Sequence, residues 1–212
     1  MLNAIGQYLL HPATIAFQIS NVLLYPVLLI EMATLAVVIF DAGLFLAELV
    51  SRLRIRRSKQ VLEQTARTAK SALAAGYPAK AAATLATLRH GRFVVAFGRA
   101  LVKDPDFNPV NLAKLVVDLE FAVSRRLERT RLMIRLGPIL GLITTLIPIS
   151  PALVGLAKGD VQTLSDNLVV AFSTTVVGLL IGGLGYLLTA VRERLYNHDI
   201  SDVEYVLDTM EA

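Results

Sequence analysis

Hydrophobic residues gather in three long runs along this 212-residue chain, separated by charged and turn-forming residues. The first run extends from about Thr14 to Val50. A helix needs only roughly 20 residues to cross a bilayer, so one span does not use the whole run. Proline suits the start of a helix or a kink in it, and we place the span at 26–50, from Pro26. We predict that residues 1–25 form an interfacial segment on the outer side.

The second and third runs predict two further membrane helices, at 132–157 and 167–191. Only residues 158–166 lie between them, and so short a connection predicts an antiparallel hairpin with a short outer loop. Asp166 stands just before the third run, where an aspartate is a favourable N-cap.

Good helix formers dominate the region 51–131 between the first two spans. The sequence Gly76-Tyr77-Pro78 predicts a break there. We expect one helix on each side of the break, at 51–75 as a continuation of the first span and at 79–102, with Gly91 and Gly98 as candidate points of disruption in the second.

A third helix of this region is predicted to begin at Pro109 with Asn108 as its N-cap, and to run unbroken into the second span. Its apolar residues recur at helical spacing: Leu112, Leu115, Val116, Leu119 and Val123. Residues 192–212 continue the third span in the same way. The pattern predicts an all-α integral membrane protein with three transmembrane helices and long helical extensions.

Composition agrees with a membrane protein, because 55% of the residues are hydrophobic and the mean hydropathy is +0.60. The chain has no cysteine, which excludes disulfides and thiolate metal sites. Its three histidines lie far apart, and there is no phosphate-binding glycine loop. We therefore expect no metal, no cofactor, no catalytic residues and no enzymatic activity.

Basic residues are distributed very unevenly, and this predicts the orientation. The first of them is Arg52, so the chain has no basic segment of the kind that begins a signal peptide, and we expect the first span to be a retained anchor. If Arg52–Arg135 and the C-terminus lie in the cytoplasm, 20 of the 21 Lys and Arg residues are inside, as the positive-inside rule requires. The N-terminus is then outside and the C-terminus cytoplasmic. The net charge of +4 reflects this placement, and we expect no nucleic-acid partner.

The predicted hairpin carries small residues and hydroxyls in place of charges. Small residues recur every three or four positions on its two helices: Gly137 and Gly141 in the first, and Ala171, Gly178, Gly182 and Gly185 in the second. Hydroxyls accompany them: Thr144, Thr145, Ser173, Thr174 and Thr175. Two interpretations stay open, close packing of membrane helices and a pore face whose hydroxyls hydrate a cation.

Two carboxylates, Glu31 and Asp41, interrupt the first run. An ionisable residue at membrane depth is a functional hypothesis, so a role in ion movement is one interpretation of each. The other places Glu31 near the outer interface and Asp41 near the inner one, where it meets a basic residue. Ten positions apart, the two residues are roughly 80° apart around a helix.

The hairpin resembles the MotA/TolQ/ExbB proton-channel family. Its first helix matches a family motif at Pro138, Gly141, Leu142 and Thr145. Its second helix matches another, and a tyrosine-asparagine end follows: Thr175, Gly178, Leu179, Tyr196 and Asn197. Val170 stands where ExbB-like members have a glutamate, so the hairpin lacks that acid.

The resemblance implies a homopentameric ring in the inner membrane around a single-span partner of the MotB, TolR or ExbD kind. Such complexes couple proton or sodium flow to mechanical work, and Thr145 and Thr175 would be pore threonines facing the partner. Because the hairpin has no titratable group, a proton pathway needs an acid from elsewhere, and an aspartate of the partner is the more economical source. A membrane scaffold without ion conduction is the alternative function.

Overall fold

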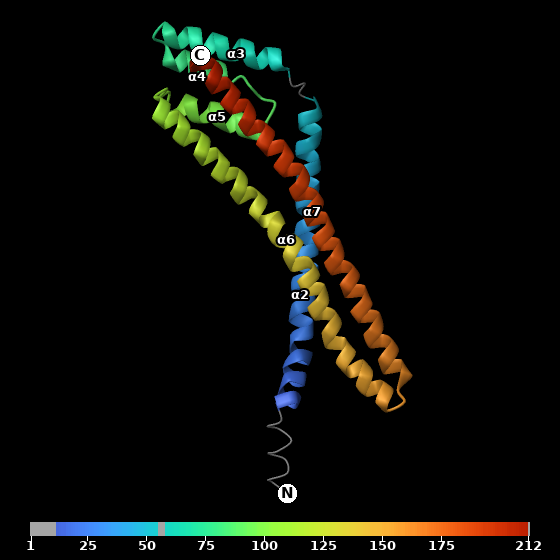
Figure 1. Cartoon of the computed structure of the whole chain (residues 1–212). Coiled ribbons are helices and arrows are strands. Elements are labelled where there is room, and N and C mark those ends of the chain that lie inside the picture. The colour runs from blue at the N-terminus through green and yellow to red at the C-terminus, as the bar shows by residue number, and fades with distance from the viewer. Residues whose placement is uncertain (1–11, 55–57, 212) are drawn as a thin grey trace. The chain divides into compact units, whose positions relative to one another are not determined.

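The computed structural model describes residues 12–54 and 58–211, and within these ranges every regular element is a helix. Figure 1 labels the helices, whose bounds are α2 Pro12–Arg54, α3 Lys59–Ala74, α4 Pro78–Leu85, α5 Arg92–Lys103, α6 Pro109–Ala157 and α7 Val161–Glu211. In the described ranges, three helices are long and apolar enough to cross a membrane, and they are α2, α6 and α7. The prediction of an all-α membrane protein with three spanning helices is confirmed.

The chain folds as two compact units. The first, here called the spanning unit, is the described part of Met1–Ala42 together with Thr130–Leu187. The second, here called the bundle unit, is the described part of Gly43–Arg129 and of Leu188–Ala212. Helices α2, α6 and α7 are each divided between the two units, with one segment in the spanning unit and one in the bundle unit.

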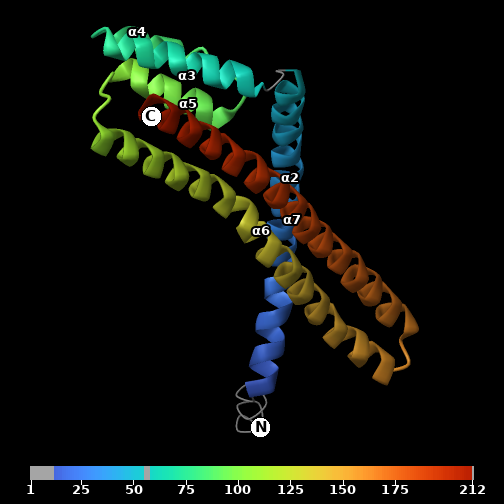
Figure 2. The same cartoon turned by 45° about the horizontal axis from the view of Figure 1, so that its top comes forward.

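In the spanning unit, α6 and α7 form the predicted hairpin and lie side by side in both views (Figures 1 and 2). Its turn is shorter than the predicted loop 158–166, because α7 already begins at Val161. Asp160, not Asp166, caps α7, since its Oδ1 accepts a hydrogen bond from the Thr163 amide at 3.0 Å. Asp166 lies inside α7 and accepts one from the Gln162 side chain at 2.8 Å. The prediction was wrong because the helix continues through a polar turn beyond its apolar run.

The first helix also starts earlier than predicted. Pro26 lies inside α2 instead of at its beginning, and α2 extends back to Pro12. A proline removes one backbone hydrogen bond, which a long membrane helix tolerates. The predicted interfacial segment 1–25 is therefore helical from Pro12, while residues 1–11 lie outside the described residues.

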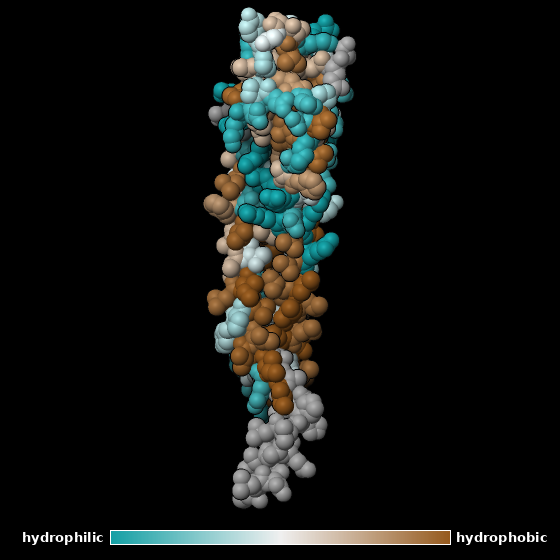
Figure 3. All heavy atoms as spheres, turned by 90° about the vertical axis from the view of Figure 1, so that its left-hand side faces the viewer, coloured by the Kyte–Doolittle hydropathy of each residue, from teal (hydrophilic) through white to brown (hydrophobic). Residues whose placement is uncertain are grey.

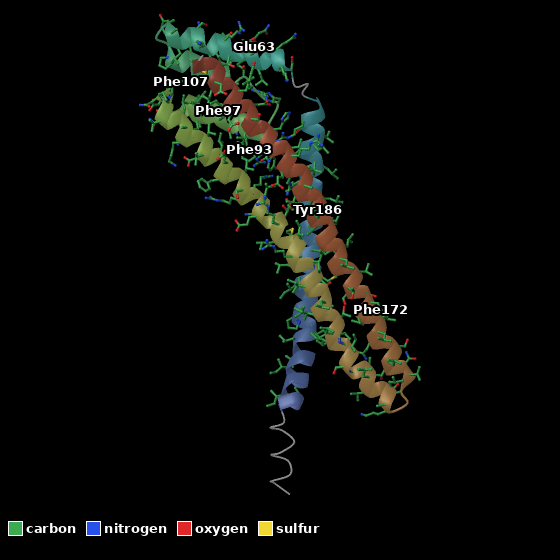
Figure 4. All side chains as sticks on the ribbon, viewed as in Figure 1. Glu63, Phe93, Phe97, Phe107, Phe172 and Tyr186 are labelled. Carbon is green, nitrogen blue, oxygen red and sulfur yellow. The ribbon has the colours of Figure 1, made fainter. Side chains whose placement is uncertain are left out.

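The bundle unit has its own hydrophobic core, which α3, α4, α5 and the adjoining segments of α6 and α7 build. The break at Gly76 is confirmed, since Gly76 has a φ of 79° and α4 begins at Pro78. On α6, Leu112, Leu119 and Val123 are buried, as their spacing predicts. Figure 4 shows Phe93 and Phe97, both buried, on α5.

Two predicted helices of this region are divided. Ser58 is extended, with φ −131° and ψ 123°, so the helix predicted at 51–75 ends with α2 and restarts as α3. The helix predicted at 79–102 is two helices, α4 and α5, separated by a linker that ends in the extended residue Gly91. Helix propensity did not reveal the break at Ser58, whereas the break at Gly91 falls at one of the two glycines named as candidate points of disruption. Helix α4 packs on both α3 and α5 (Figure 2).

Surface chemistry separates the spanning helices from the short ones. In the view of Figure 3, hydrophobic residues predominate on the spanning unit, and hydrophilic residues gather on the bundle unit. Exposed apolar side chains on α7 include Phe172 and Tyr186, labelled in Figure 4, with 66% and 62% of their surface accessible. So much exposed apolar surface fits lipid or neighbouring membrane helices.

Candidate functional site: a threonine pair and a buried glutamate

Glycines bring the backbones of α6 and α7 into direct contact in the spanning unit. A Cβ added to Gly137 would lie 2.6 Å from both the Gly178 carbonyl oxygen and the Gly182 amide nitrogen. One added to Gly141 would lie 3.1 Å from the Gly178 Cα. Side chains have no room at these positions, so the small residues fix the distance between the helices.

The other small residues of the predicted face continue this contact along α7. A Cβ on Gly182 would meet the Pro138 ring at 3.0 Å, and one on Gly185 would meet the Ile134 amide nitrogen at 3.2 Å. Ala171 is 1% exposed at the other end of the contact. All six predicted packing residues thus lie at the α6–α7 contact or are buried beside it.

Thr145 of α6 and Thr175 of α7 hydrogen-bond to each other through their hydroxyls. Thr145 also lies 2.6 Å from the Gly141 carbonyl oxygen, and Thr175 lies 2.9 Å from that of Ala171. Each hydroxyl has a single proton, so when one threonine donates to the other, the second is free to donate to its own helix. Both side chains are half-buried, which leaves the pair accessible from one side of the unit.

Glu31 reaches the hairpin from α2, next to this pair. Its side chain is fully buried, and its Oε2 lies 3.1 Å from the Thr144 hydroxyl. The Thr144 hydroxyl also lies 2.9 Å from the Leu140 carbonyl oxygen and 3.2 Å from that of Gly141, so its one proton has three competing acceptors. Glu31 Oε1 has no hydrogen-bond partner among the described residues. A carboxyl group in an apolar membrane helix with one oxygen unpaired is costly to ionise and calls for a functional explanation.

The remaining predicted site residues are not part of this cluster. Thr174 is buried, with its hydroxyl 3.0 Å from the carbonyl oxygen of Val170 on its own helix. Ser173 is exposed and donates to the Val169 carbonyl at 2.7 Å, so it lies on a different face from Thr175. Asp41 is half-buried, ten residues and about 15 Å along α2 from Glu31.

Sequence reasoning missed a second polar cluster, which lies in the bundle unit. Arg52 binds Asp199 through two hydrogen bonds of 2.8 and 2.9 Å, and Glu48 through one of 3.2 Å. Tyr196, fully buried, donates to Glu48 at 3.2 Å and accepts from Arg126 Nε at 2.9 Å. These groups satisfy one another, which identifies the cluster as a structural network of the bundle.

The same network also caps α5. Asp199 Oδ2 accepts a hydrogen bond of 3.2 Å from the Phe93 amide in the first turn of that helix. Gly91 packs directly on the Asp199 carboxylate, and a Cβ there would collide with it. The sequence held one signal of this network. Asp199 stands within the periodic apolar pattern of Tyr196, Ile200 and Val203, on the side of the helix that is expected to be buried.

No metal site accompanies either cluster in the described part of the chain, where no three His, Asp or Glu side chains are grouped to hold an ion. The chemistry of the first cluster is therefore that of hydroxyls, backbone carbonyls and one carboxyl group at membrane depth. Such groups can exchange hydrogen bonds with a water molecule, and their oxygens can coordinate a cation.

Comparison with known protein families gives a match that includes the residues of the threonine pair. The family model described as "MotA/TolQ/ExbB proton channel family" matches residues 102–204, which include the threonine pair and the glycine contact. Over these residues the chain is similar to the MotA/TolQ/ExbB proton channel family. The resemblance inferred from the motifs is thereby confirmed. No curated protein and no solved structure matches the chain.

The three candidate spanning helices and the match to this family support a multi-pass protein of the inner membrane. Glu31 lies outside the matched residues, on a helix that the family model does not cover. Val170, where ExbB-like members carry a glutamate, has 38% of its surface exposed one turn from Thr174. The acid of this site therefore comes from α2 and not from the hairpin.

Proposed function

We propose that this chain is the channel-type subunit of an ion-driven motor complex, in which proton flow across the inner membrane drives mechanical work. The observation that carries the proposal is the hydrogen-bonded pair Thr145–Thr175 in an uncharged hairpin that the family model covers. We propose no enzymatic activity for it.

The threonine pair suits ion transfer because its hydrogen bonds can be exchanged without moving the backbone. The two hydroxyls have two protons, and the hydrogen bond between them uses one. The second proton can be donated to the backbone carbonyl of Gly141 or of Ala171. A hydrated cation or a water chain that enters from the accessible side replaces these internal bonds with bonds of its own.

The second component is a single-span partner of the MotB, TolR or ExbD kind, which supplies a titratable aspartate facing the threonines. We propose a homopentamer of this chain around that partner, with the N-terminus outside and the bundle unit in the cytoplasm. The uneven placement of basic residues supports this orientation.

Glu31 adds an acid that belongs to the chain itself. Its hydrogen bond to Thr144, the neighbour of Thr145, puts a carboxyl group beside the proposed path. We propose that Glu31 exchanges a proton with water in this path, in series with the partner's aspartate. Transfer of one proton down about 200 mV releases roughly 4–5 kcal/mol, which is enough to shift a conformational equilibrium strongly.

Proton flux into vesicles that contain the chain and its partner tests the assignment. Thr145→Val and Thr175→Val together keep the side-chain volume and remove both hydroxyls. We expect flux to fall roughly tenfold or more, since an added barrier of about 1.4 kcal/mol already gives that factor. Ser173→Ala is the matched control, because this hydroxyl lies on another face and its loss should leave flux unchanged.

The scaffold function predicts a different result for the same variants. If the chain only assembles other proteins, the double threonine variant keeps full function and only bulky changes at the glycine contact abolish it. Unchanged ion-driven work in the threonine variant would reject the proposed path.

A further inference from the structure

A basic cavity opens in the bundle unit where the apolar run of α2 gives way to basic residues. Its volume is about 630 Å³. One wall is a face of α2 that includes Glu48, Ser51 and Arg52. The opposite wall belongs to α5 and to the linker that precedes it. The cavity takes no part in the threonine site, which lies in the other unit.

Three arginines in this cavity have no acidic partner in the described part of the chain. Arg92 and Arg99 lie seven residues apart, so both point from the same face of α5, and Arg89 belongs to the linker. All three side chains are exposed. Arg52 in the opposite wall is already bound by Asp199 and Glu48. Those two ion pairs hold that wall rigid, so the three exposed guanidinium groups are the ones available to a ligand.

The charge of the lining points to an anion. Four arginines and one glutamate line the cavity, which leaves a net charge of +3 with His90 neutral. Guanidinium groups bind phosphate oxygens with two parallel hydrogen bonds, and three of them around one cavity suit a phosphate, which has more oxygens to share among them than a carboxylate.

The source of the phosphate follows from the surroundings of the cavity. On α2, Leu44 lies four residues before Glu48, on the face that forms the cavity wall, and has 51% of its surface exposed. An acyl chain can lie along this surface while its headgroup enters the cavity. The change from apolar to basic residues also places the cavity at the depth of lipid headgroups.

We propose that this cavity binds the phosphodiester headgroup of an anionic membrane lipid, with Arg89, Arg92 and Arg99 as its phosphate ligands. The site fastens the bundle unit to the membrane surface at the end of α2. This proposal does not rest on the proposed ion path, and it holds equally for a scaffold protein.

Native mass spectrometry of the detergent-solubilised full chain tests it, with phosphatidylglycerol and phosphatidylcholine of the same acyl chains as probes. We expect the wild-type chain to retain phosphatidylglycerol preferentially. The variant R89Q/R92Q/R99Q should lose the preference by on the order of a hundredfold, since each basic residue contributes roughly a factor of five near an anionic headgroup. Lys80→Gln, Lys103→Gln and Arg125→Gln together form the control, because these exposed residues remove the same charge outside the cavity.

Several outcomes would overturn the proposal. Equal loss of lipid in the control variant would show that net charge, and not the cavity, retains the lipid. Inorganic phosphate that binds as tightly as phosphatidylglycerol would identify a site for a soluble anion. If the triple variant unfolds, the single variant R99Q replaces it, and an unchanged lipid preference in that variant also rejects the proposal.

Discussion

Gly178 of α7 lies against Gly137 of α6 so closely that a Cβ on Gly178 would be 2.6 Å from the Gly137 carbonyl oxygen. The same Cβ would be 2.7 Å from the Gly141 Cα. All these atoms belong to the backbone, which cannot turn aside as a long side chain can. The separation of the hairpin helices, and with it the hydrogen bond between Thr145 and Thr175, depends on this contact.

Gly178→Ala should therefore destabilise the hairpin. Overpacking a close contact costs about 1–3 kcal/mol, because the helices must separate to admit the methyl group. Thermal unfolding of the detergent-solubilised protein measures the loss. Gly183→Ala is the matched control, since a Cβ at Gly183 meets nothing within 4 Å and alanine favours the helix. Equal midpoints for the two variants would refute the importance of the contact.

Local patterns in the sequence were enough to predict the three spans and the small-residue face of the hairpin. Gly178 and Gly182 stand four residues apart, and that spacing alone puts them on one side of a helix. The start of α6 at Pro109, with Asn108 as its N-cap, was predicted from neighbouring residues in the same way. The Val110 amide does donate a hydrogen bond to Asn108 Oδ1 at 3.0 Å. Such features depend only on residues close together in the chain.

Contacts between distant residues could not be predicted in this way. Glu31 and Thr144 are 113 residues apart, and their meeting depends on how α2 rotates against the hairpin. Arg52 and Asp199 are 147 residues apart, and nothing near either one indicates its partner. The cap of α7 was misplaced for a related reason, because hydropathy located the apolar run and not the end of the helix at Asp160.

Glu31→Gln should lower proton flux while leaving thermal stability unchanged or slightly higher. Glutamine keeps the volume of the side chain and can accept the hydrogen bond from Thr144, but it cannot take up or release a proton. It also removes a buried carboxyl group that has one unpartnered oxygen. Flux in reconstituted vesicles and the thermal midpoint are measured on the same preparation. Full flux in this variant would exclude Glu31 from the path.

Asp199→Asn should destabilise the bundle unit strongly. The carboxylate binds both terminal nitrogens of Arg52 and also caps α5 at the Phe93 amide, and its side chain is 4% exposed. Removing one partner of a buried ion pair costs roughly 3–5 kcal/mol. Urea unfolding measures this loss in the free energy of unfolding. Asp208→Asn, an exposed change on the same helix, should stay within about 0.5 kcal/mol of the wild type. A comparable small loss for Asp199→Asn would show that the network contributes little.

Asn108→Ala should weaken the start of α6. The Asn108 side chain caps the helix at the Val110 amide, and loss of such a cap costs about 1 kcal/mol. The free energy of unfolding in urea, compared with that of the exposed change Asn197→Ala within α7, checks the value. If both variants lose the same small amount, the cap is not responsible.

The loop before α6 should also make stability depend on acid. Hydrogen bonds from the Asn108 amide at 2.9 Å and from the Asn111 side chain lower the pKa of Asp106 below its ordinary value. A carboxyl group with a lowered pKa stabilises the folded state above its unfolded pKa, and this stabilisation is lost as pH falls through the folded pKa. Asp106→Asn should therefore flatten the decline of the thermal midpoint at acid pH, while near neutral pH it leaves one of the two acceptor oxygens and loses the charge. An acid profile that keeps its full slope in this variant would assign the decline to other carboxylates.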